Sequence, residues 1–387
     1  GKTAIEIIDD IHKQMGKTII IIEHRLEDVL HRDVDRVIVI NDGCIIADMS
    51  AHDLVSSDVL KEIGIREPLY VTSLKYANIP VTPQMKPGHI WSLDTNAVNE
   101  ALRSWNRSVK TPLEAPPRPP LLTIDHLSFS YDGVRPTLSD INFEIREGEM
   151  VSIVGKNGAG KSTLAKLMCG FEKVDKGAIL YKGQDIHKQS IKERAEFIGF
   201  VMQNPNQMIS KNLIFDEVAL GLRLRGVNEE EIKDRVEKVL DICGLSPFIE
   251  WPISALSYGQ KKRVTIASIL VLRPNILILD EPTAGQDYRH YSEIMEFLRQ
   301  INETGVSIIL ITHDMHLMLE YTPRAIVLSE GQQIADTLAS VVLTDPQTIA
   351  AANLKETSLY HLAQLAGIPD GTQFVQHFID YERVAGQ

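Results

Sequence analysis

The segment from Gly155 to Thr163 constrains the fold of this 387-residue chain more than any other feature. It follows the spacing G-x-x-x-x-G-K-[ST], in which glycines let the backbone wrap so that successive N–H groups point at phosphate oxygens. The apolar run Met150–Val154 precedes it, and a helical pattern begins near Lys161. Strand, glycine-rich loop and helix in that order predict a phosphate-binding loop. The residues expected to contact nucleotide are Gly155, Lys156, Asn157, Gly158, Ala159, Gly160, Lys161, Ser162 and Thr163.

Two residues of this loop carry the chemistry that a nucleotide needs. Lys161 supplies a full positive charge to the β- and γ-phosphates, next to the positive end of the helix dipole. Ser162 offers a hydroxyl to Mg²⁺. We therefore expect ATP and Mg²⁺ as ligands.

A pair of carboxylates follows a second apolar run, Ile276–Leu279. Ligands of open parallel sheets bind at the carboxyl ends of the strands, and this pair stands at such an end. Asp280 is expected to hold Mg²⁺ through water, and Glu281 to polarise a water that attacks the γ-phosphate.

One proline-rich stretch, 111–120, divides the chain. It contains five prolines, which cannot sit inside a helix or a central strand, so an extended linker is expected. After it, apolar runs alternate with helical patterns such as Glu229–Cys243 and Tyr291–Thr304. Continuous apolar runs suit buried parallel strands, so this part is predicted to be one α/β domain.

The region before the linker repeats the end of that domain. Gly16–His24 matches Gly305–His313, and Arg36–Gly43 matches Arg324–Gly331, at an offset close to 289. Further matches follow, Leu69-Tyr70 with Leu359-Tyr360 and Ile79-Pro80 with Ile368-Pro369. Residues 1–80 are therefore expected to be a second copy of the last third of the main domain, without its own phosphate loop, in a chain that is N-terminally incomplete.

Composition and charge weigh against several classes of protein. The formal net charge of −12 argues against a nucleic-acid surface, and no apolar run approaches the roughly 20 residues that span a bilayer. The three cysteines are scattered and show neither metal spacing nor a disulfide framework.

The segment Leu256-Ser257-Tyr258-Gly259-Gln260 lies between the phosphate loop and the carboxylate pair. It resembles the signature motif of the ATP-binding cassette (ABC) family, usually L-S-G-G-Q, with Tyr258 in place of the first glycine. The resemblance implies that Ser257, Gly259 and Gln260 contact the nucleotide held by the phosphate loop of another cassette.

The same resemblance assigns four more residues. Gln203 resembles the Q-loop glutamine, which senses Mg²⁺. His313 resembles the switch histidine near the γ-phosphate, and Asp287 the D-loop aspartate. Tyr131 resembles the aromatic residue that stacks on adenine. His24 matches His313 but has no phosphate loop beside it, and the cluster Lys261–Arg263 is expected to be a solvated helix face.

The family implies a P-loop NTPase fold of the ABC type with a helical subdomain, preceded by the C-terminal part of a second such domain. The expected parts are a partial first cassette, 1–80, a connecting segment, 81–120, a complete cassette, 121–345, with the helical subdomain at about 204–270, and a C-terminal extension, 346–387.

Segments such as Gln203–Met208 resemble ATPases of energy-coupling-factor importers, and the tandem arrangement is most similar to a hydroxymethylpyrimidine/thiamine-type importer. That implies ATP hydrolysis that powers import of a vitamin, a vitamin precursor or a transition metal ion such as cobalt. The implied partners are a transmembrane coupling subunit, a substrate-binding membrane subunit and a second cassette, from the same full-length chain or from a homodimer. The implied location is the cytoplasmic face of the cell membrane.

Two alternatives stay open. The first is a soluble tandem ABC protein that acts on ribosomes or nucleic acid. A long charged helical linker and a basic surface would mark such a protein, whereas this linker is short and proline-rich. The second is a single-cassette importer of another substrate class, which requires the repeat in 1–80 to be accidental.

Overall fold

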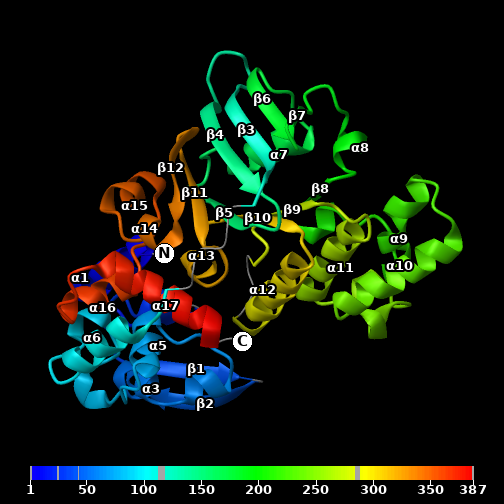
Figure 1. Cartoon of the computed structure of the whole chain (residues 1–387). Helices are drawn as coiled ribbons and strands as arrows, with labels where there is room; N and C mark the ends of the chain where they lie inside the picture. The colour runs from blue at the N-terminus through cyan, green and yellow to red at the C-terminus, as the bar shows by residue number, and fades with distance from the viewer. Residues whose placement is uncertain (1, 24–25, 42, 112–117, 284–287, 386–387) are drawn as a thin grey trace. The chain divides into compact units, whose positions relative to one another are not determined.

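The computed structural model describes residues 2–23, 26–41, 43–111, 118–283 and 288–385. The chain divides into two compact units (Figure 1). The first contains 1–113, 287–289 and 356–387, and the second contains 114–286 and 290–355. Each unit is described by itself.

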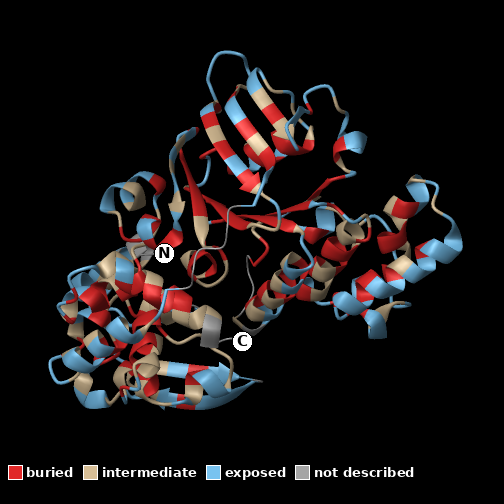
Figure 2. Ribbon diagram, viewed as in Figure 1, coloured by how far each residue is buried: buried red, intermediate tan, exposed pale blue. Residues whose placement is uncertain are grey.

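A six-stranded sheet forms the centre of the second unit, in the order β12-β11-β5-β10-β9-β8. All neighbouring pairs are parallel except β11 and β12. Every residue of β5 and β10 is buried (Figure 2), which explains why their sequences are mostly apolar. The strands are β5 (Met150–Val154), β8 (Ile198–Val201), β9 (Ile276–Asp280), β10 (Ser307–Thr312), β11 (Arg324–Ser329) and β12 (Gln332–Leu338).

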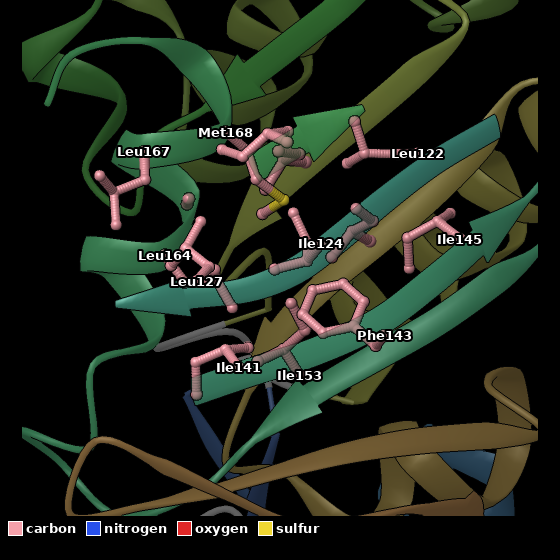
Figure 3. Packing of buried hydrophobic residues seen from close by; sticks show 14 of the residues in the cluster. Leu122, Ile124, Leu127, Ile141, Phe143, Ile145, Ile153, Leu164, Leu167 and Met168 are labelled. Atoms are coloured by element: carbon pink, nitrogen blue, oxygen red, sulfur yellow. The ribbon is translucent and has the colours of Figure 1, made fainter. Parts of the chain in front are cut away.

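A four-stranded antiparallel sheet of order β4-β3-β6-β7 packs on helix α7 (Lys161–Cys169). Leu164, Leu167 and Met168 of α7 meet the apolar face of this sheet in one buried cluster (Figure 3), which also contains Ile153 of β5. The helix that follows the phosphate loop is thus held between two sheets. The antiparallel strands are β3 (Pro120–Phe129), β4 (Leu138–Arg146), β6 (Lys176–Tyr181) and β7 (Gln184–Asp185).

The helices of the second unit include a helical subdomain made by α9, α10 and α11. In α10 the buried residues are Ile232, Val236, Val239 and Leu240, the spacing expected of an amphipathic helix. The side chain of Asn228 caps α10 by accepting from the N–H of Glu231. The helices are α8 (Ile191–Arg194), α9 (Ile214–Leu224), α10 (Glu229–Ile242), α11 (Tyr258–Leu270), α12 (Tyr288–Glu303, in this unit from His290 on), α13 (Met315–Tyr321), α14 (Ala339–Val342) and α15 (Pro346–Ala352), with short 3₁₀ turns η3 (Pro205–Gln207), η4 (Ser246–Phe248) and η5 (Ile253–Ala255).

The first unit joins the beginning of the chain to its end. Trp105 of α6 packs edge-on against Phe374 of α17, and the carboxylate of Glu27 accepts hydrogen bonds from the N–H of Leu69 and the hydroxyl of Ser358. The predicted extension 346–387 is therefore divided, with α15 in the second unit and α16 and α17 in the first. The elements are α1 (Lys2–Met15), α2 (Leu26–Val29), β1 (Val37–Asn41), β2 (Cys44–Met49), α3 (Ala51–Ser56), α4 (Val59–Glu62), α5 (Leu69–Tyr76), η1 (Pro83–Met85), η2 (Ile90–Ser92), α6 (Asn99–Ser108), α16 (Ser358–Leu365) and α17 (Gly371–Ala385).

The hairpin β1–β2 has the same construction as the hairpin β11–β12. The register shifts between Val39 and Ile40 in the first and between Val327 and Leu328 in the second, which are equivalent positions of the repeat. Arg36 pairs with Asp48 in the first hairpin, as Arg324 pairs with Asp336 in the second. This likeness supports the expectation that residues 1–80 copy the last third of the main domain, which stays a prediction.

The two copies differ at the strand that precedes the hairpin. Residues 307–312 form β10, bonded on both sides by β5 and β9, whereas residues 16–23 form no strand. Ile20 and Ile22 are 86% and 96% exposed. A parallel strand needs neighbours to pair with, and the described residues of the first unit contain only the β1–β2 pair. His24 and residues 112–117 of the linker lie outside the described residues.

The antiparallel sheet provides a test of the fold through two glycines with positive φ. A Cβ on Gly177 (φ +85°) would lie 2.4 Å or less from the carbonyl oxygens of Asp125 and His126, where β3 bulges. A Cβ on Gly183 (φ +76°) would meet nothing within 4 Å. We expect Gly183→Ala to cost roughly 1–2 kcal/mol of unfolding free energy for the left-handed backbone alone. Gly177→Ala should cost a further ~1–3 kcal/mol because its methyl group has no space.

Urea unfolding of both variants measures this difference. Equal losses of stability would show that β6 does not approach the bulge of β3 as closely as described.

Candidate functional site

The phosphate loop can be formed only with glycine at two of its positions. Gly155 has a φ of +148°, and a Cβ there would lie 2.0 Å from the carbonyl oxygen of Leu328. Gly160 has a φ of +100°, and a Cβ there would lie 2.5 Å from Cδ2 of Leu138. Glycine at these positions lets the loop turn from the end of β5 into α7 while it packs directly against Leu328 of β11 and Leu138 of β4.

Lys161 is the first residue of α7 and is buried, with 8% of its surface exposed. Its Nζ donates to the carbonyl oxygen of Gly155 at 2.7 Å and to that of Lys156 at 3.0 Å. Burial lowers the pKa of Lys161, and the charges of Glu281 and Asp280 oppose that shift. The ammonium group therefore lies inside the curve of the loop, where phosphate oxygens would meet it.

The remaining residues of the loop lie around this ammonium group. Nζ of Lys156 forms an exposed ion pair with Glu330 at 2.8 Å. Asn157 and Gly158 are exposed at the outer bend of the loop, whereas Ala159 is buried. The exposed ring of Tyr131 lies nearby, with its hydroxyl 3.4 Å from Oγ1 of Thr163 and its ring edge-on to Phe129. An exposed aromatic face beside a phosphate loop suits stacking of a nucleotide base.

The hydroxyl of Ser162 and the carboxylate of Asp280 lie together beside the phosphate loop. The hydroxyl of Ser162 donates to Oδ2 of Asp280 at 2.9 Å. Burial raises the pKa of Asp280, and its hydrogen bond with Ser162 opposes the shift. No group of three or more His, Cys, Asp or Glu side chains in the described chain could hold a metal ion. A hydroxyl and a single carboxylate are, however, what Mg²⁺ uses when phosphates and water supply its other ligands.

Glu281 has an unusual backbone for a glutamate. Its φ is +47°, in the left-handed region, which costs a non-glycine residue roughly 1–2 kcal/mol. Its N–H donates to the carbonyl oxygen of Ile311, and Nδ1 of His313 lies 2.6 Å from its Oε1. The side chain of Glu281 is 12% exposed and that of His313 is 56% exposed. The structure thus brings these two predicted residues together, with the histidine on the solvent side.

The signature residues form the beginning of α11. The hydroxyl of Ser257 accepts from the N–H of Gln260, and Oε1 of Gln260 accepts from the N–H of Ser257, which is a capping box. Gly259 is buried in the first turn. Gln260, expected to contact nucleotide, thus has a local role as well, and the spacing Ser257-x-x-Gln260 of a capping box could have indicated it. A cavity of about 350 Å³ beside these residues is lined by Gly244, Phe248, Ser257, Gly259, Gln260, Arg263, His290, Glu293 and Ile294.

Gln203 is the second residue after β8, and it is exposed. Its carbonyl oxygen accepts a hydrogen bond from Nζ of Lys262 at 2.9 Å and one from the hydroxyl of Tyr258 at 3.3 Å. The prediction of a solvated face at Lys261–Arg263 is therefore wrong for Lys262, which is 1% exposed. Burial lowers the pKa of Lys262 to about 8.

Two features of the site differ in whether the sequence could have revealed them. Lys262 could have been recognised as buried, because it shares a helical stripe with Gly259 and Ile266, both of which are buried. The left-handed backbone of Glu281 leaves no signal in the sequence. Asp287 and the rest of 284–287 lie outside the described residues.

Comparison with known proteins identifies the family. Residues 138–284 match the family model described as ABC transporter, and residues 57–129 match one described as ATP-binding cassette cobalt transporter. A protein of Clostridium perfringens, named as an ABC transporter ATP-binding protein, is 57% identical over 385 residues, which are 100% of this chain and 68% of that protein. This chain belongs to the ATP-binding proteins of ABC transporters. A similarly named protein of Enterococcus faecalis is 52% identical over 99% of this chain and 67% of its own length.

Solved structures agree with the ABC fold. CbiO1 from Clostridium perfringens, part of the ABC transporter complex CbiONQ, superposes with a TM-score of 0.56 at 35% identity, over 60% of this chain and 94% of its own. The ADP conformation of another ABC transporter cassette has the same TM-score at 24% identity, over 60% of this chain and 98% of its own, and it shows the fold alone. The predicted α/β fold of an ABC ATPase is confirmed. The chain is an ATPase of the transport type, and none of its described helices is long and apolar enough to cross a membrane.

Replacement of Lys161 tests the nucleotide-binding loop. We expect Lys161→Ala to weaken binding of ATP in the presence of Mg²⁺ by at least about tenfold, because one or two charge-assisted hydrogen bonds to phosphate are lost. Titration calorimetry measures the change. Lys166→Ala, at an exposed position of the same helix, is the matched control and should bind as the parent chain does. Equal affinity in both variants would contradict the assignment of the loop.

Proposed function

We propose that this ABC ATPase powers solute import of the energy-coupling-factor type through membrane partner subunits. The observation that carries the proposal is the arrangement of one complete cassette site on a chain whose residues 57–129 match a family model described for a cobalt transporter. The match to CbiO1, which is part of a transporter complex, supports the same assembly.

In this proposal the site residues divide the work of ATP hydrolysis. Lys161 and the loop backbone bind the β- and γ-phosphates, and Tyr131 stacks on the base. Ser162 and Asp280, with the amide of Gln203, would hold Mg²⁺. When bound, Mg²⁺ would neutralise charge that develops on the phosphate oxygens.

Glu281 and His313 act at the γ-phosphate end of the site. Glu281 is positioned to accept a proton from the attacking water, because its backbone is fixed by the hydrogen bond to Ile311 and its carboxylate lies beside the histidine. His313, mostly exposed, is positioned to donate toward the γ-phosphate.

The signature residues serve a second site in this proposal. Ser257 and Gly259 would contact the nucleotide held by the phosphate loop of another cassette, from the same full-length chain or from a second copy. Residues 1–80 would be part of the first cassette. The equivalent register of the hairpins β1–β2 and β11–β12 supports this division.

The comparisons support a class of transported solute and do not name a single compound. The family description favours a transition metal ion such as cobalt over the hydroxymethylpyrimidine or thiamine that the sequence resemblance suggested. The partners would be a coupling subunit and a substrate-binding subunit in the membrane, with this chain at its cytoplasmic face.

Replacement of Glu281 tests the catalytic assignment. We expect Glu281→Gln to bind ATP as the parent does and to hydrolyse it roughly 10²–10⁴-fold more slowly, since the general base is lost while the shape is kept. Steady-state phosphate release by the assembled transporter measures the rate. Glu303→Gln, at the exposed end of α12, is the control and should keep the parent rate. Parent-like turnover of Glu281→Gln would remove this residue from the mechanism.

Uptake by proteoliposomes tests the transport assignment. The complete protein, purified with the membrane proteins that accompany it, should accumulate labelled Co²⁺ when ATP is supplied on its side of the membrane. Uptake of thiamine instead of Co²⁺ would support the import function but contradict the assignment of a metal ion as the solute. Co-purification with ribosomes or nucleic acid in place of membrane proteins would contradict the proposed function.

A further inference from the structure

The signature helix carries a lysine where an apolar residue would be expected. Lys262 lies in the second turn of α11 and is 1% exposed. Taking an ammonium group out of water costs several kcal/mol unless hydrogen bonds and opposite charges compensate. Its neighbours therefore show what the charge is used for.

Both hydrogen bonds of the Lys262 ammonium group reach the Q-loop backbone. Nζ donates to the carbonyl oxygen of Met202 at 2.7 Å and to that of Gln203 at 2.9 Å. These carbonyls follow immediately after Val201, the last residue of β8, where ladder bonds to β9 end. The lysine thus supplies donors to main-chain acceptors that the sheet no longer pairs.

A second side chain of the same helix reaches the same acceptor. The hydroxyl of Tyr258 donates to the carbonyl oxygen of Gln203 at 3.3 Å. Tyr258 and Lys262 are four residues apart, so they lie on one face of α11. Tyr258 is also the residue that departs from the usual glycine of the signature motif, and its hydroxyl adds a contact that glycine cannot make.

The Q-loop, taken as the segment from Met202 to Lys211, is also held at its second end by the helical subdomain. The carboxylate of Glu217, on α9, accepts from the N–H of Ser210 at 2.8 Å and from that of Lys211 at 2.7 Å. Helices α9 and α11 therefore hold the segment from Met202 to Lys211 at both ends. The helical subdomain, rather than the sheet alone, sets where the Q-loop lies.

We propose that Lys262 and Tyr258 are positioning residues that tie Gln203 to the start of the signature helix. Gln203 then moves with Ser257, which caps the same helix. When the nucleotide of another cassette engages the signature residues, Gln203 is therefore also placed in the nucleotide site of this cassette. The link between the two sites rests on the proposed function, because it requires the signature to serve a second cassette.

The test compares turnover of the assembled transporter in two backgrounds. Lys262→Met keeps an apolar stem of similar length and removes the donors that reach the carbonyl oxygens of Met202 and Gln203. We expect it to keep ATP affinity and to lower kcat roughly 10–100-fold, because a small misplacement of a catalytic group costs that much. Lys261→Met, on the adjacent, half-buried position, is the control and should keep the parent rate.

The second background removes the side chain that Lys262 is proposed to position. In Gln203→Ala, which keeps the backbone carbonyl, Lys262→Met should lower kcat no further, since the amide is already absent. The same fold loss in both backgrounds would show a general structural role and overturn the proposal, as would a parent-like kcat for Lys262→Met.

Tyr258→Phe repeats the test without touching a buried charge, in case Lys262→Met does not fold. It should lower kcat a few-fold in the parent background and leave it unchanged in Gln203→Ala. Equal effects in both backgrounds would again overturn the proposal. Failure of the proposed function is seen separately, as co-purification with ribosomes or nucleic acid in place of membrane proteins.

Discussion

The site depends on four adjacent parallel strands that end at one edge of a sheet. In the order β5-β10-β9-β8, a residue of the site stands one or two positions after the end of each strand. Gly155 follows β5, His313 follows β10 and Glu281 follows β9, and Gln203 is the second residue after β8. Parallel pairing places all four carboxyl ends together, so residues more than 150 positions apart in sequence share one site. Helices and a second sheet must cover both faces of such a sheet, so its central strands are buried and mostly apolar.

Motif spacing was enough to predict the phosphate loop, because its glycines and lysine have meaning within nine consecutive residues. The strand that ends at Asp280 was predictable for a similar reason, because a continuous apolar run indicates burial on both faces of a sheet. Contacts between distant elements were not predictable in this way. The closeness of Glu281 and His313 depends on strand order, and the left-handed backbone at Glu281 depends on its bond to β10.

Lys262 shows where charge patterning misleads. Three consecutive basic residues are typical of a solvated helix face, yet the middle one turns toward the Q-loop carbonyls. Helical periodicity would have favoured burial, but it cannot say which acceptors compensate a buried charge. Those acceptors exist only because β8 ends beside α11.

The repeat shows the difference between local and non-local structure. The hairpin β1–β2 keeps the register of β11–β12, since an antiparallel pair supplies its own hydrogen bonds. The run from 16 to 23 matches β10 in sequence but forms no strand, because a central parallel strand requires partners from distant parts of a chain. Sequence similarity therefore predicted the hairpin better than the strand.

The central claim is that these strand ends assemble one ATP site. A crystal structure of the Glu281→Gln protein with ATP and Mg²⁺ tests it most directly. We expect the phosphates to lie within the loop from Gly155 to Thr163, with Mg²⁺ held by Ser162 and Asp280. Nucleotide bound elsewhere, or a metal ion that contacts neither residue, would contradict it.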